Sequence, residues 1–215
     1  MEAVLGNVDL LVEAFTTTLS LFGLSALGAL VLGTILAAMR VSPVPPLRAA
    51  ATAYVQGVRN TPLTVVFFFC VFGLPEVDII LDFFPFAVLA LTLYTASFIA
   101  EAVRSGINSV PVGQAEASRS IGMTFPQTLG VVVLPQALRT VIPPISSILI
   151  ALLKNTSIAY AFGVFEGTSA TYLLVNDFGS QVIQILFISA AIYLGLALLI
   201  SAALAWVERK VAIAR

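Results

Sequence analysis

The stretch QAEASRSIGMTFPQTLGVVVLPQAL, Gln114–Leu138, stands out in an otherwise apolar chain. Its first half carries Glu116, Ser118 and Arg119, so it is too polar to lie in lipid, and the whole stretch is too long for a tight turn. A polar segment between two apolar ones is best placed at a membrane surface. We therefore expect it to fold outside the bilayer, between two membrane-spanning segments.

The composition of the whole chain is that of an integral membrane protein. Of its 215 residues 60% are hydrophobic and 10% are charged, whereas about a quarter of the residues of soluble domains are charged. The chain has no His, and its single Cys, Cys70, lies in an apolar run, which excludes disulfide frameworks and Cys/His zinc sites. A net charge of −1 gives no reason to expect nucleic acid as a partner.

Five charge-poor segments are long enough to cross a bilayer, because the membrane core needs about 20 apolar residues in a helix. We predict an all-α integral membrane protein with one transmembrane domain over residues 1–215. The expected spans are 14–39, 50–74, 83–104, 139–162 and 178–207, with a polar loop at 106–135 between the third and fourth. The first span is too long, and its start too acidic, for a cleaved signal peptide, so we expect it to be retained.

The basic residues predict the orientation, because Lys and Arg collect in cytoplasmic loops. They follow the first, third and fifth spans: Arg40, Arg48, Arg104, Arg119, Arg139, Arg209, Lys210 and Arg215. The loops on the other side are acidic: Glu76, Asp78, Asp82, Glu166 and Asp177. This pattern predicts an external N-terminus, a cytoplasmic C-terminus and a cytoplasmic position for the Gln114–Leu138 stretch.

Within that stretch the sequence predicts two short helices. The first follows Pro111 and ends at Gly122, since glycine is common just after the last residue of a helix. Thr124, with Gln127 three residues later, has the capping-box pattern that begins a second helix. From composition alone, a solvated loop with a little helix and an element that docks into a partner are equally good interpretations.

The motif Glu116-Ala117-Ser118, followed by Gly122 and by Leu134-Pro135, resembles the EAA loop of ABC importer permeases. Ser118 replaces the second Ala of the motif, a change between small residues that should leave a helix intact. Four blocks in order resemble the polar amino acid permeases, the branch that imports glutamine, glutamate, histidine and arginine. They are RNTPLTVVFFFCVFGLP (Arg59–Pro75), FIAEAVRSGINSVPVGQAEASRSIGM (Phe98–Met123), LPQALRTVIPP (Leu134–Pro144) and LLKNTSIAYAFGV (Leu152–Val164).

This resemblance, which covers nearly the whole chain, implies a mechanism and a set of partners. In the family the EAA loop is a coupling helix that inserts into a cleft of the ATPase subunit, and access to the pathway alternates as the ATPase closes. The implied partners are ABC ATPase subunits, a second permease subunit (a copy or a sister chain), an extracytoplasmic amino acid-binding protein and the cell membrane. The implied coupling residues are Glu116, Ala117, Ser118, Arg119 and Gly122.

The sequence itself does not predict an enzyme. The Walker A pattern Gly-x4-Gly-Lys-Ser/Thr is absent, so ATP and Mg²⁺ are expected on the partner ATPase and no cofactor on this chain. No paired catalytic carboxylates or nucleophile constellation occurs. A secondary transporter driven by an ion gradient is the alternative, but it would normally need more spans and inverted repeats.

Ionisable residues inside the spans are the candidates for a solute pathway, because charge in lipid is costly and usually functional. Arg59 lies roughly 14 Å into the second span at 1.5 Å per residue, and Asn60, Thr61 and Pro62 follow it. Pro62 frees backbone carbonyls, which favours a kinked polar patch at mid-depth. Alternatively, Arg59 reaches the interface or pairs structurally with Glu101 or Glu166.

A second polar group lies near the end of the fourth span. Lys154 is roughly 22 Å along the helix from Arg139, and Asn155, Thr156 and Ser157 follow it. This group is either a further part of the pathway or an interfacial lysine with polar neighbours.

Three more residues are candidates for gates or ion pairs. Glu101 and Arg104 are three residues apart on one helix face, which favours an ion pair over contact with solute. Glu166 could seal an outer gate or touch solute, or could be a solvated external carboxylate.

The cations in the spans suggest the kind of solute. Arg59 and Lys154 would attract an anionic side chain, which favours an acidic amino acid such as glutamate or aspartate, or the amide glutamine. If Glu101 and Glu166 neutralise both cations, the pathway would instead be indifferent to charge.

Overall fold

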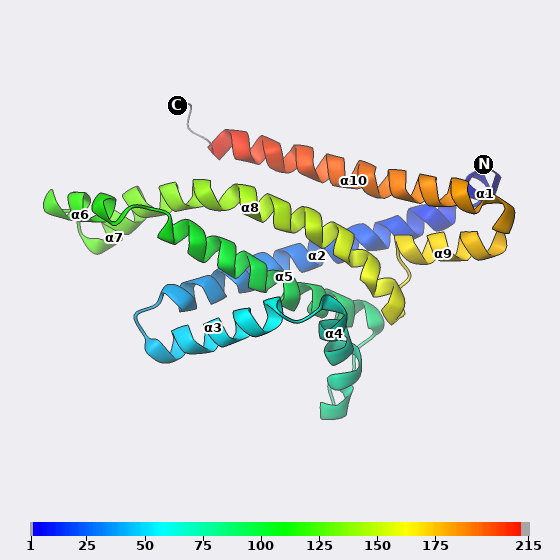
Figure 1. The fold of residues 1–215 in the computed structure, drawn as a ribbon, viewed down its shortest axis with the longest axis horizontal. Coiled ribbons are helices and arrows are strands. Elements are labelled where there is room, and N and C mark those ends of the chain that lie inside the picture. Colours follow the sequence, from blue (N-terminus) through cyan, green and yellow to red (C-terminus); the bar gives the residue numbers. More distant parts are fainter. Residues whose placement is uncertain (1, 212–215) are drawn as a thin grey trace.

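The computed structural model describes residues 2–211, and every regular element within this range is helical, which confirms the all-α class (Figure 1). Arg215, counted above among the basic residues, lies outside the described range. Four helical stretches are long and apolar enough to cross a membrane: Val8–Val41, Phe83–Asn108, Phe125–Phe162 and Gly179–Lys210.

The structure divides these stretches and their connections into ten α-helices. They are α1 (Glu2–Leu5), α2 (Val8–Val41), α3 (Pro45–Arg59), α4 (Leu63–Phe68), α5 (Phe83–Asn108), α6 (Val112–Ser120), α7 (Phe125–Gln127), α8 (Leu134–Asn155), α9 (Gly167–Asp177) and α10 (Val182–Val211). Two π-helical segments, Phe69–Gly73 and Thr128–Val133, continue α4 and α7, and 3₁₀ segments cover Pro75–Val77, Thr156–Phe162 and Gly179–Gln181.

The second expected span, 50–74, is not one straight helix but a bent pair, Pro45–Arg59 and Leu63–Val77, which together are apolar and long enough to be a fifth span. The helix α3 ends at Arg59 and α4 begins at Leu63, with a bend of 110° between them. Pro62 has no N–H to continue the α3 ladder, and its own carbonyl accepts from the backbone N–H groups of Val65 and Val66 to start α4. The sequence therefore predicted the position of the break, but the structure turns the chain far more sharply than a kink.

The fourth expected span, 139–162, begins earlier than predicted. The helix runs without a break from Phe125 through the π-helical segment to Phe162, so the second short helix expected after Gly122 is the start of this long one. Pro135 has no N–H for the helical ladder, and it directly follows the π-helical segment Thr128–Val133, where the regular α-helical ladder is already interrupted.

The centre of the molecule is the contact between α2 and α5, which run in the same direction, with α8 packed on α5 and α10 outermost on α8 (Figure 1). Small residues bring α2 and α5 close together. A Cβ on Gly33 would lie 2.7 Å from Cβ of Ile99, so this crossing requires glycine. Ala29, Ala37 and Ala96 are fully buried at the same contact.

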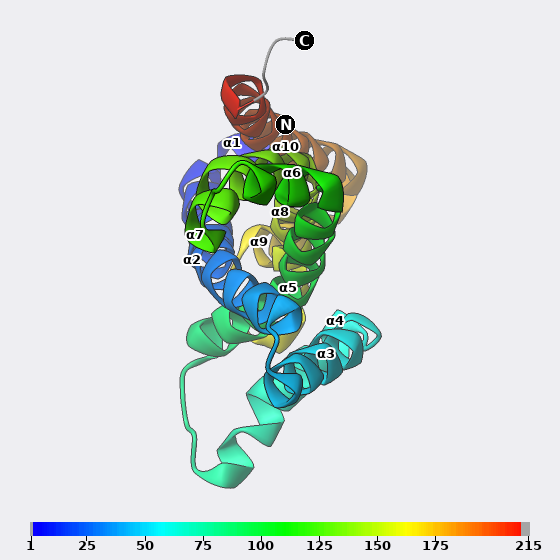
Figure 2. The same cartoon turned by 90° about the vertical axis from the view of Figure 1, so that its left-hand side faces the viewer.

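The segment from α4 to the start of α5 projects away from the bundle (Figure 2). It exposes the aromatic side chains of Phe68, Phe69 and Phe72. Exposed apolar side chains of this size fit a lipid or protein environment better than water.

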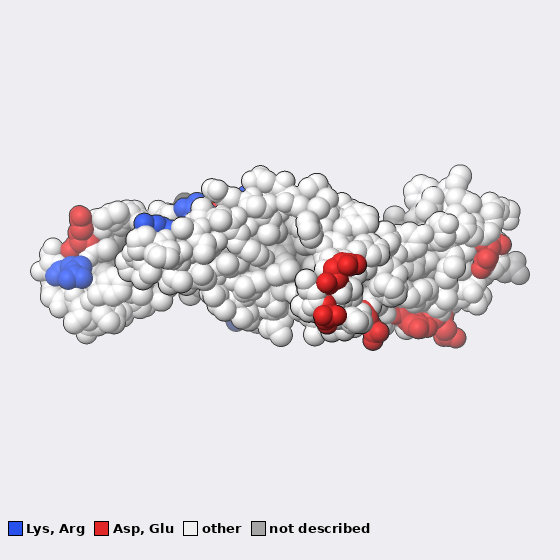
Figure 3. All heavy atoms as spheres, turned by 90° about the horizontal axis from the view of Figure 1, so that it is seen from below, with Lys and Arg blue, Asp and Glu red and all other residues white. Residues whose placement is uncertain are grey.

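Charge separates along the long axis of the molecule. Acidic side chains gather toward the end that carries α9 and at the projecting segment, while basic side chains lie toward the end that carries α6, where acidic atoms also lie beside them (Figure 3). The separation predicted from the sequence is therefore also a separation in space.

Candidate functional site

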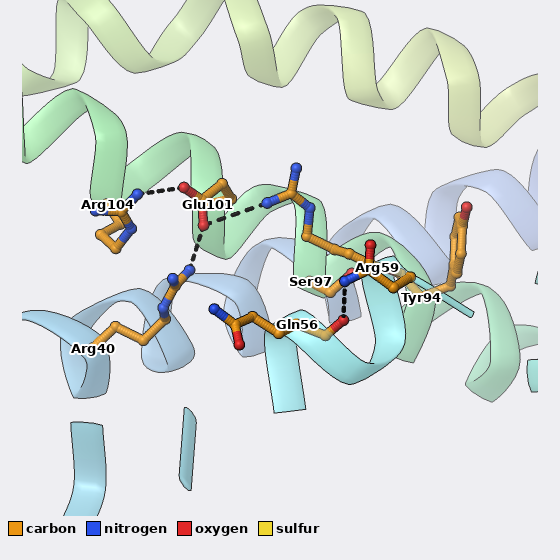
Figure 4. A network of polar contacts seen from close by, with 8 residues as sticks. Arg40, Gln56, Arg59, Tyr94, Ser97, Glu101 and Arg104 are labelled. Atoms are coloured by element: carbon orange, nitrogen blue, oxygen red, sulfur yellow. Dashed lines mark hydrogen bonds and ion pairs between the residues drawn. The ribbon is translucent and has the colours of Figure 1, made fainter. Parts of the chain in front are cut away.

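The most densely charged part of the described chain is a cluster of three arginines around one glutamate (Figure 4). Glu101 on α5 accepts from Arg104, one turn further along the same helix, through Oε1. Its Oε2 lies 2.5 Å from Nη1 of Arg40 at the end of α2 and 3.4 Å from Nη1 of Arg59 at the end of α3. The expected pair of Glu101 and Arg104 is present, and Arg59 contacts Glu101, which is the pairing given above as the alternative to a pathway role.

The side chains of the three arginines differ in how far they are exposed. The side chain of Arg40 is 9% exposed, whereas that of Arg59 is 38% exposed. The guanidinium of Arg59 also lies over the ring of Phe98, 5.3 Å from its centroid, a favourable cation–π geometry. Arg59 is therefore the arginine of the cluster that is most accessible to a ligand.

A cavity of about 440 Å³ opens beside Arg59 and Glu101, a size typical of small-molecule sites. Its other lining residues supply hydroxyl groups and a small, partly apolar wall: Phe98, Ala102, Ser105, Gly106, Ser109, Thr140, Pro144 and Ile148. A cationic group and several hydroxyls around one cavity can bind a small polar anion.

The residues that follow Arg59 turn away from this cavity. The amide of Asn60 donates to the carbonyl of Gln56 at 2.8 Å, and the hydroxyl of Thr61 donates to that of Gly57 at 2.8 Å. Both side chains thus bond to backbone carbonyls in the last turn of α3, and the carbonyl of Gln56 also accepts from the backbone N–H of Asn60. Thr61 lines a separate, mostly apolar cavity of about 320 Å³ beside Tyr54.

The polar group at the end of α8 is split by the structure. Asn155 lines a cavity of about 170 Å³ together with Tyr94 and Phe98. Thr156 is fully buried and its hydroxyl donates to the carbonyl of Leu153 at 2.7 Å, so it does not face a pathway in this structure. Ser157 donates to the carbonyl of Lys154 at 2.8 Å. Lys154 itself is exposed and forms no ion pair within the described part of the chain.

Glu166 is fully buried, so the interpretation as a solvated external carboxylate is wrong. It caps α9, where Oε1 accepts from the backbone N–H of Thr168 at 2.8 Å and of Ser169 at 3.2 Å. Its Oε2 accepts from the hydroxyls of Tyr193 on α10 at 2.7 Å and of Thr18 on α2 at 3.5 Å. Burial raises the pKa of Glu166 above its ordinary value, although these hydrogen bonds act in the opposite direction.

The Gln114–Leu138 stretch forms a compact helix–turn–helix at one end of the molecule (Figure 1). Gly122 ends α6 with φ +90°, a left-handed conformation that suits glycine. The backbone N–H of Met123 donates to the carbonyl of Ser118 and that of Gly122 to Arg119, the two bonds of a Schellman motif. Gln127 Oε1 accepts from the backbone N–H of Thr124 at 2.9 Å, as the capping-box pattern predicts.

Ser118 has a role that the sequence did not suggest. It is 6% exposed, and its hydroxyl donates to the carbonyl of Ala115 at 2.8 Å and lies 3.0 Å from the hydroxyl of Thr128. Thr128 belongs to the long helix that becomes α8, so this buried contact joins α6 to that helix. The other EAA-motif side chains, Glu116, Ala117 and Arg119, are exposed on α6.

Large apolar side chains are exposed beside those of the EAA motif. Val112, Ile121 and Phe125 are 72%, 80% and 64% exposed. A surface with this mixture of charged and apolar groups is typical of a protein–protein contact.

Residues 29–213 match the family described as binding-protein-dependent transport system inner membrane component. The chain belongs to this family. It is thus a multi-pass membrane permease subunit of an ABC importer and not an enzyme, since ATP hydrolysis in these importers is carried out by a separate subunit. This confirms the resemblance drawn from the Glu116–Gly122 motif and the four sequence blocks.

Two relatives and one solved structure are similar to this permease over nearly its whole length. It is 40% identical to the glutamate transport system permease protein GluC of Corynebacterium glutamicum, with 94% of each chain covered. It is 38% identical to the probable glutamine ABC transporter permease protein GlnM of Bacillus subtilis, covering 95% of this chain and 94% of that one. A crystal structure of an amino acid ABC transporter with histidines matches with a TM-score of 0.88 at 28% identity, over 96% of both chains.

Arg40 is the part of the site that sequence reasoning missed in this permease. It was interpreted only as a basic residue in the loop after the first span, whereas its guanidinium makes a short contact with Glu101. The only available signal was its position, since a cation that directly ends an apolar helix can fold back along the helix toward a neighbour.

Proposed function

We propose that this permease imports an acidic amino acid or its amide, with glutamate as the best candidate, by alternating access driven by a separate ABC ATPase. The pathway passes the cavity beside Arg59. The relatives named for glutamate and glutamine transport support this solute class. In this proposal the chain works with a second permease subunit and an external binding protein.

The observation that carries the proposal is the unequal number of charges around Glu101. Three guanidinium groups share one carboxylate, which leaves the cluster with two excess positive charges. Glu101 therefore cannot neutralise the cluster, and Glu166 contacts neither Arg59 nor Lys154, because α9 and hydroxyl groups surround it. An anionic solute is attracted to such a cavity and a cationic one is repelled.

The proposal assigns the coupling role to α6 with the Gly122 turn, and the cytoplasmic side to the basic end of the molecule. The exposed Glu116 and Arg119 and the apolar Ile121 support docking of this end into a cleft of the ATPase. The positive-inside rule supports the orientation.

Uptake into proteoliposomes tests the proposal. The permease is reconstituted with its ATPase and with a binding protein that accepts both acidic and basic amino acids, and uptake of radiolabelled glutamate is measured with unlabelled competitors. We expect ATP-dependent uptake that unlabelled glutamate and glutamine weaken more than arginine does, because arginine then competes only for the binding protein. Uptake that follows the membrane potential without the ATPase would instead indicate a secondary transporter, and competition by arginine stronger than by glutamate would contradict the charge argument.

The Arg59→Ala variant tests the site in the same assay. Its glutamate uptake should fall roughly tenfold, the size of one hydrogen-bonded charge contact, and its glutamine uptake should fall much less. Equal losses for the two solutes would make Arg59 a structural residue only.

A further inference from the structure

We propose that Glu101 is a resident carboxylate that holds Arg59 while the pathway is empty, and that the carboxylate of an arriving acidic amino acid displaces it. Arg40 and Arg104 are then positioning residues, which keep Glu101 in place while Arg59 exchanges partners. This inference rests on the proposed function, because it explains how the same cavity distinguishes an acidic side chain from its amide.

The distances and exposures rank the three contacts of Glu101. Arg40 and Arg59 share Oε2, at 2.5 Å and 3.4 Å, while Arg104 has Oε1 to itself. Arg59 therefore has the longest contact, and its side chain is also the most exposed of the three. An exposed, long ion pair contributes little stability, so the bond between Arg59 and Glu101 is the one that a competing carboxylate can replace.

The cluster is able to accept a second carboxylate. Three guanidinium groups surround one carboxylate, so two positive charges are uncompensated. Of the three arginines only Arg59 lines the cavity, so a further anion would meet this excess at Arg59 and lower it from two charges to one.

After the exchange, Glu101 and Arg59 each still have a partner of opposite charge. When Arg59 turns to a solute, Glu101 keeps Arg40 and Arg104, so its charge stays paired. Arg59 keeps the ring of Phe98 beneath its guanidinium, 5.3 Å away, which limits how far the side chain can move. Both Arg59 and Glu101 line the same cavity, so the leaving and arriving carboxylates are within reach of one guanidinium.

The inference predicts a difference between solutes that differ only in charge. The side-chain carboxylate of glutamate can replace Glu101 on Arg59, whereas the neutral amide of glutamine offers a weaker acceptor and leaves the pair intact. Weakening the pair between Arg59 and Glu101 should therefore improve the binding of glutamate and leave that of glutamine unchanged.

Equilibrium dialysis of the purified permease–ATPase complex, without binding protein, measures this difference with radiolabelled L-glutamate and L-glutamine. In Glu101→Gln the Kd for glutamate should fall roughly two- to fivefold, the equivalent of a partly exposed ion pair, with the Kd for glutamine unchanged. Glu101→Asp keeps the charge that Arg40 and Arg104 need, but its shorter side chain loses the long contact to Arg59 first. Like Glu101→Gln, it should lower the Kd for glutamate and leave the Kd for glutamine unchanged, and it provides the test if Glu101→Gln does not fold.

Two controls separate exchange from other effects. Glu13→Gln removes an exposed carboxylate without an ion pair in the described chain, and both Kd values should stay at the wild-type level. In an Arg59→Gln background, Glu101→Gln should no longer improve glutamate binding. A persistent improvement there would mean that the carboxylate acts through its long-range field, and the exchange would be wrong.

The remaining outcomes also have definite meanings. If both Glu101 variants weaken glutamate and glutamine equally, Glu101 is only a structural clamp and the inference fails, while the proposed function stands. If the wild-type importer with its binding protein takes up no amino acid, the proposed function fails and this inference fails with it.

Discussion

At the scale of single residues, the buried Glu166 is the group whose environment differs most from that of an ordinary carboxylate. It has no cationic partner among the described residues, and backbone N–H groups of α9 and hydroxyls from α2 and α10 surround it. Because burial raises its pKa, the folded protein binds a proton at this site more readily than the unfolded chain does. The stabilisation linked to this proton is complete below the unfolded pKa and is lost as the pH rises through the higher native pKa.

This linkage predicts how thermal stability depends on pH. The Tm of the wild type in detergent should fall as the pH rises above about 4.5, the ordinary value for Glu, and Glu166→Gln should remove this part of the slope. Glu166→Ala should lose about 1–3 kcal/mol at every pH, since it leaves the first turn of α9 uncapped and buried donors unpaired. The exposed Asp177→Asn is the matched control, and an identical slope in Glu166→Gln and wild type would contradict the assignment.

At the scale of elements, the contact between Ser118 and Thr128 joins α6 to the helix that becomes α8. Both residues are buried and their hydroxyl oxygens lie 3.0 Å apart. The contact thus ties α6 to a continuous helix that reaches Phe162. If α6 docks into the ATPase as proposed, this hydroxyl pair is part of the mechanical link to the membrane domain.

We expect Ser118→Ala to uncouple the importer partially. The loss of one buried hydrogen bond, about 1 kcal/mol, should lower uptake roughly two- to fivefold while ATP hydrolysis continues, so more ATP is consumed per solute. Ser120→Ala is the matched control, because its hydroxyl is exposed and bonds only to the carbonyl of Glu116. Thr128→Ser retains a hydroxyl and should transport normally. The same ratio of hydrolysis to transport in Ser118→Ala and Ser120→Ala would show that the contact plays no part in coupling.

At the scale of the whole molecule, the separation of charge predicts how the permease sits in the membrane. The end with α6, which carries basic side chains, should face the cytoplasm (Figure 3). The acidic segment around Asp78, between α4 and α5, should face outward. Labelling with a membrane-impermeant maleimide tests this after Cys70→Ser removes the native thiol. In intact spheroplasts Asp78→Cys should react, whereas Ser120→Cys should react only after permeabilisation. The reverse pattern would invert the orientation.

The sequence by itself determined the properties that depend on local composition. The membrane class follows from 60% hydrophobic and 10% charged residues. The separation of charge follows from which loops hold Arg and Lys. The helix end at Gly122, the cap at Thr124 and the break at Pro62 follow from backbone chemistry that acts within a few residues.

Only the tertiary structure decided how these elements meet. Arg40 and Glu101 are 61 positions apart, and they touch because glycine and alanine let α2 and α5 approach closely. The burial of Glu166 likewise depends on α2, α9 and α10 meeting at one point. The excess of positive charge beside the cavity is therefore a product of helix packing, since contacts between helices depend on the shape of both surfaces and not on the local pattern of either one.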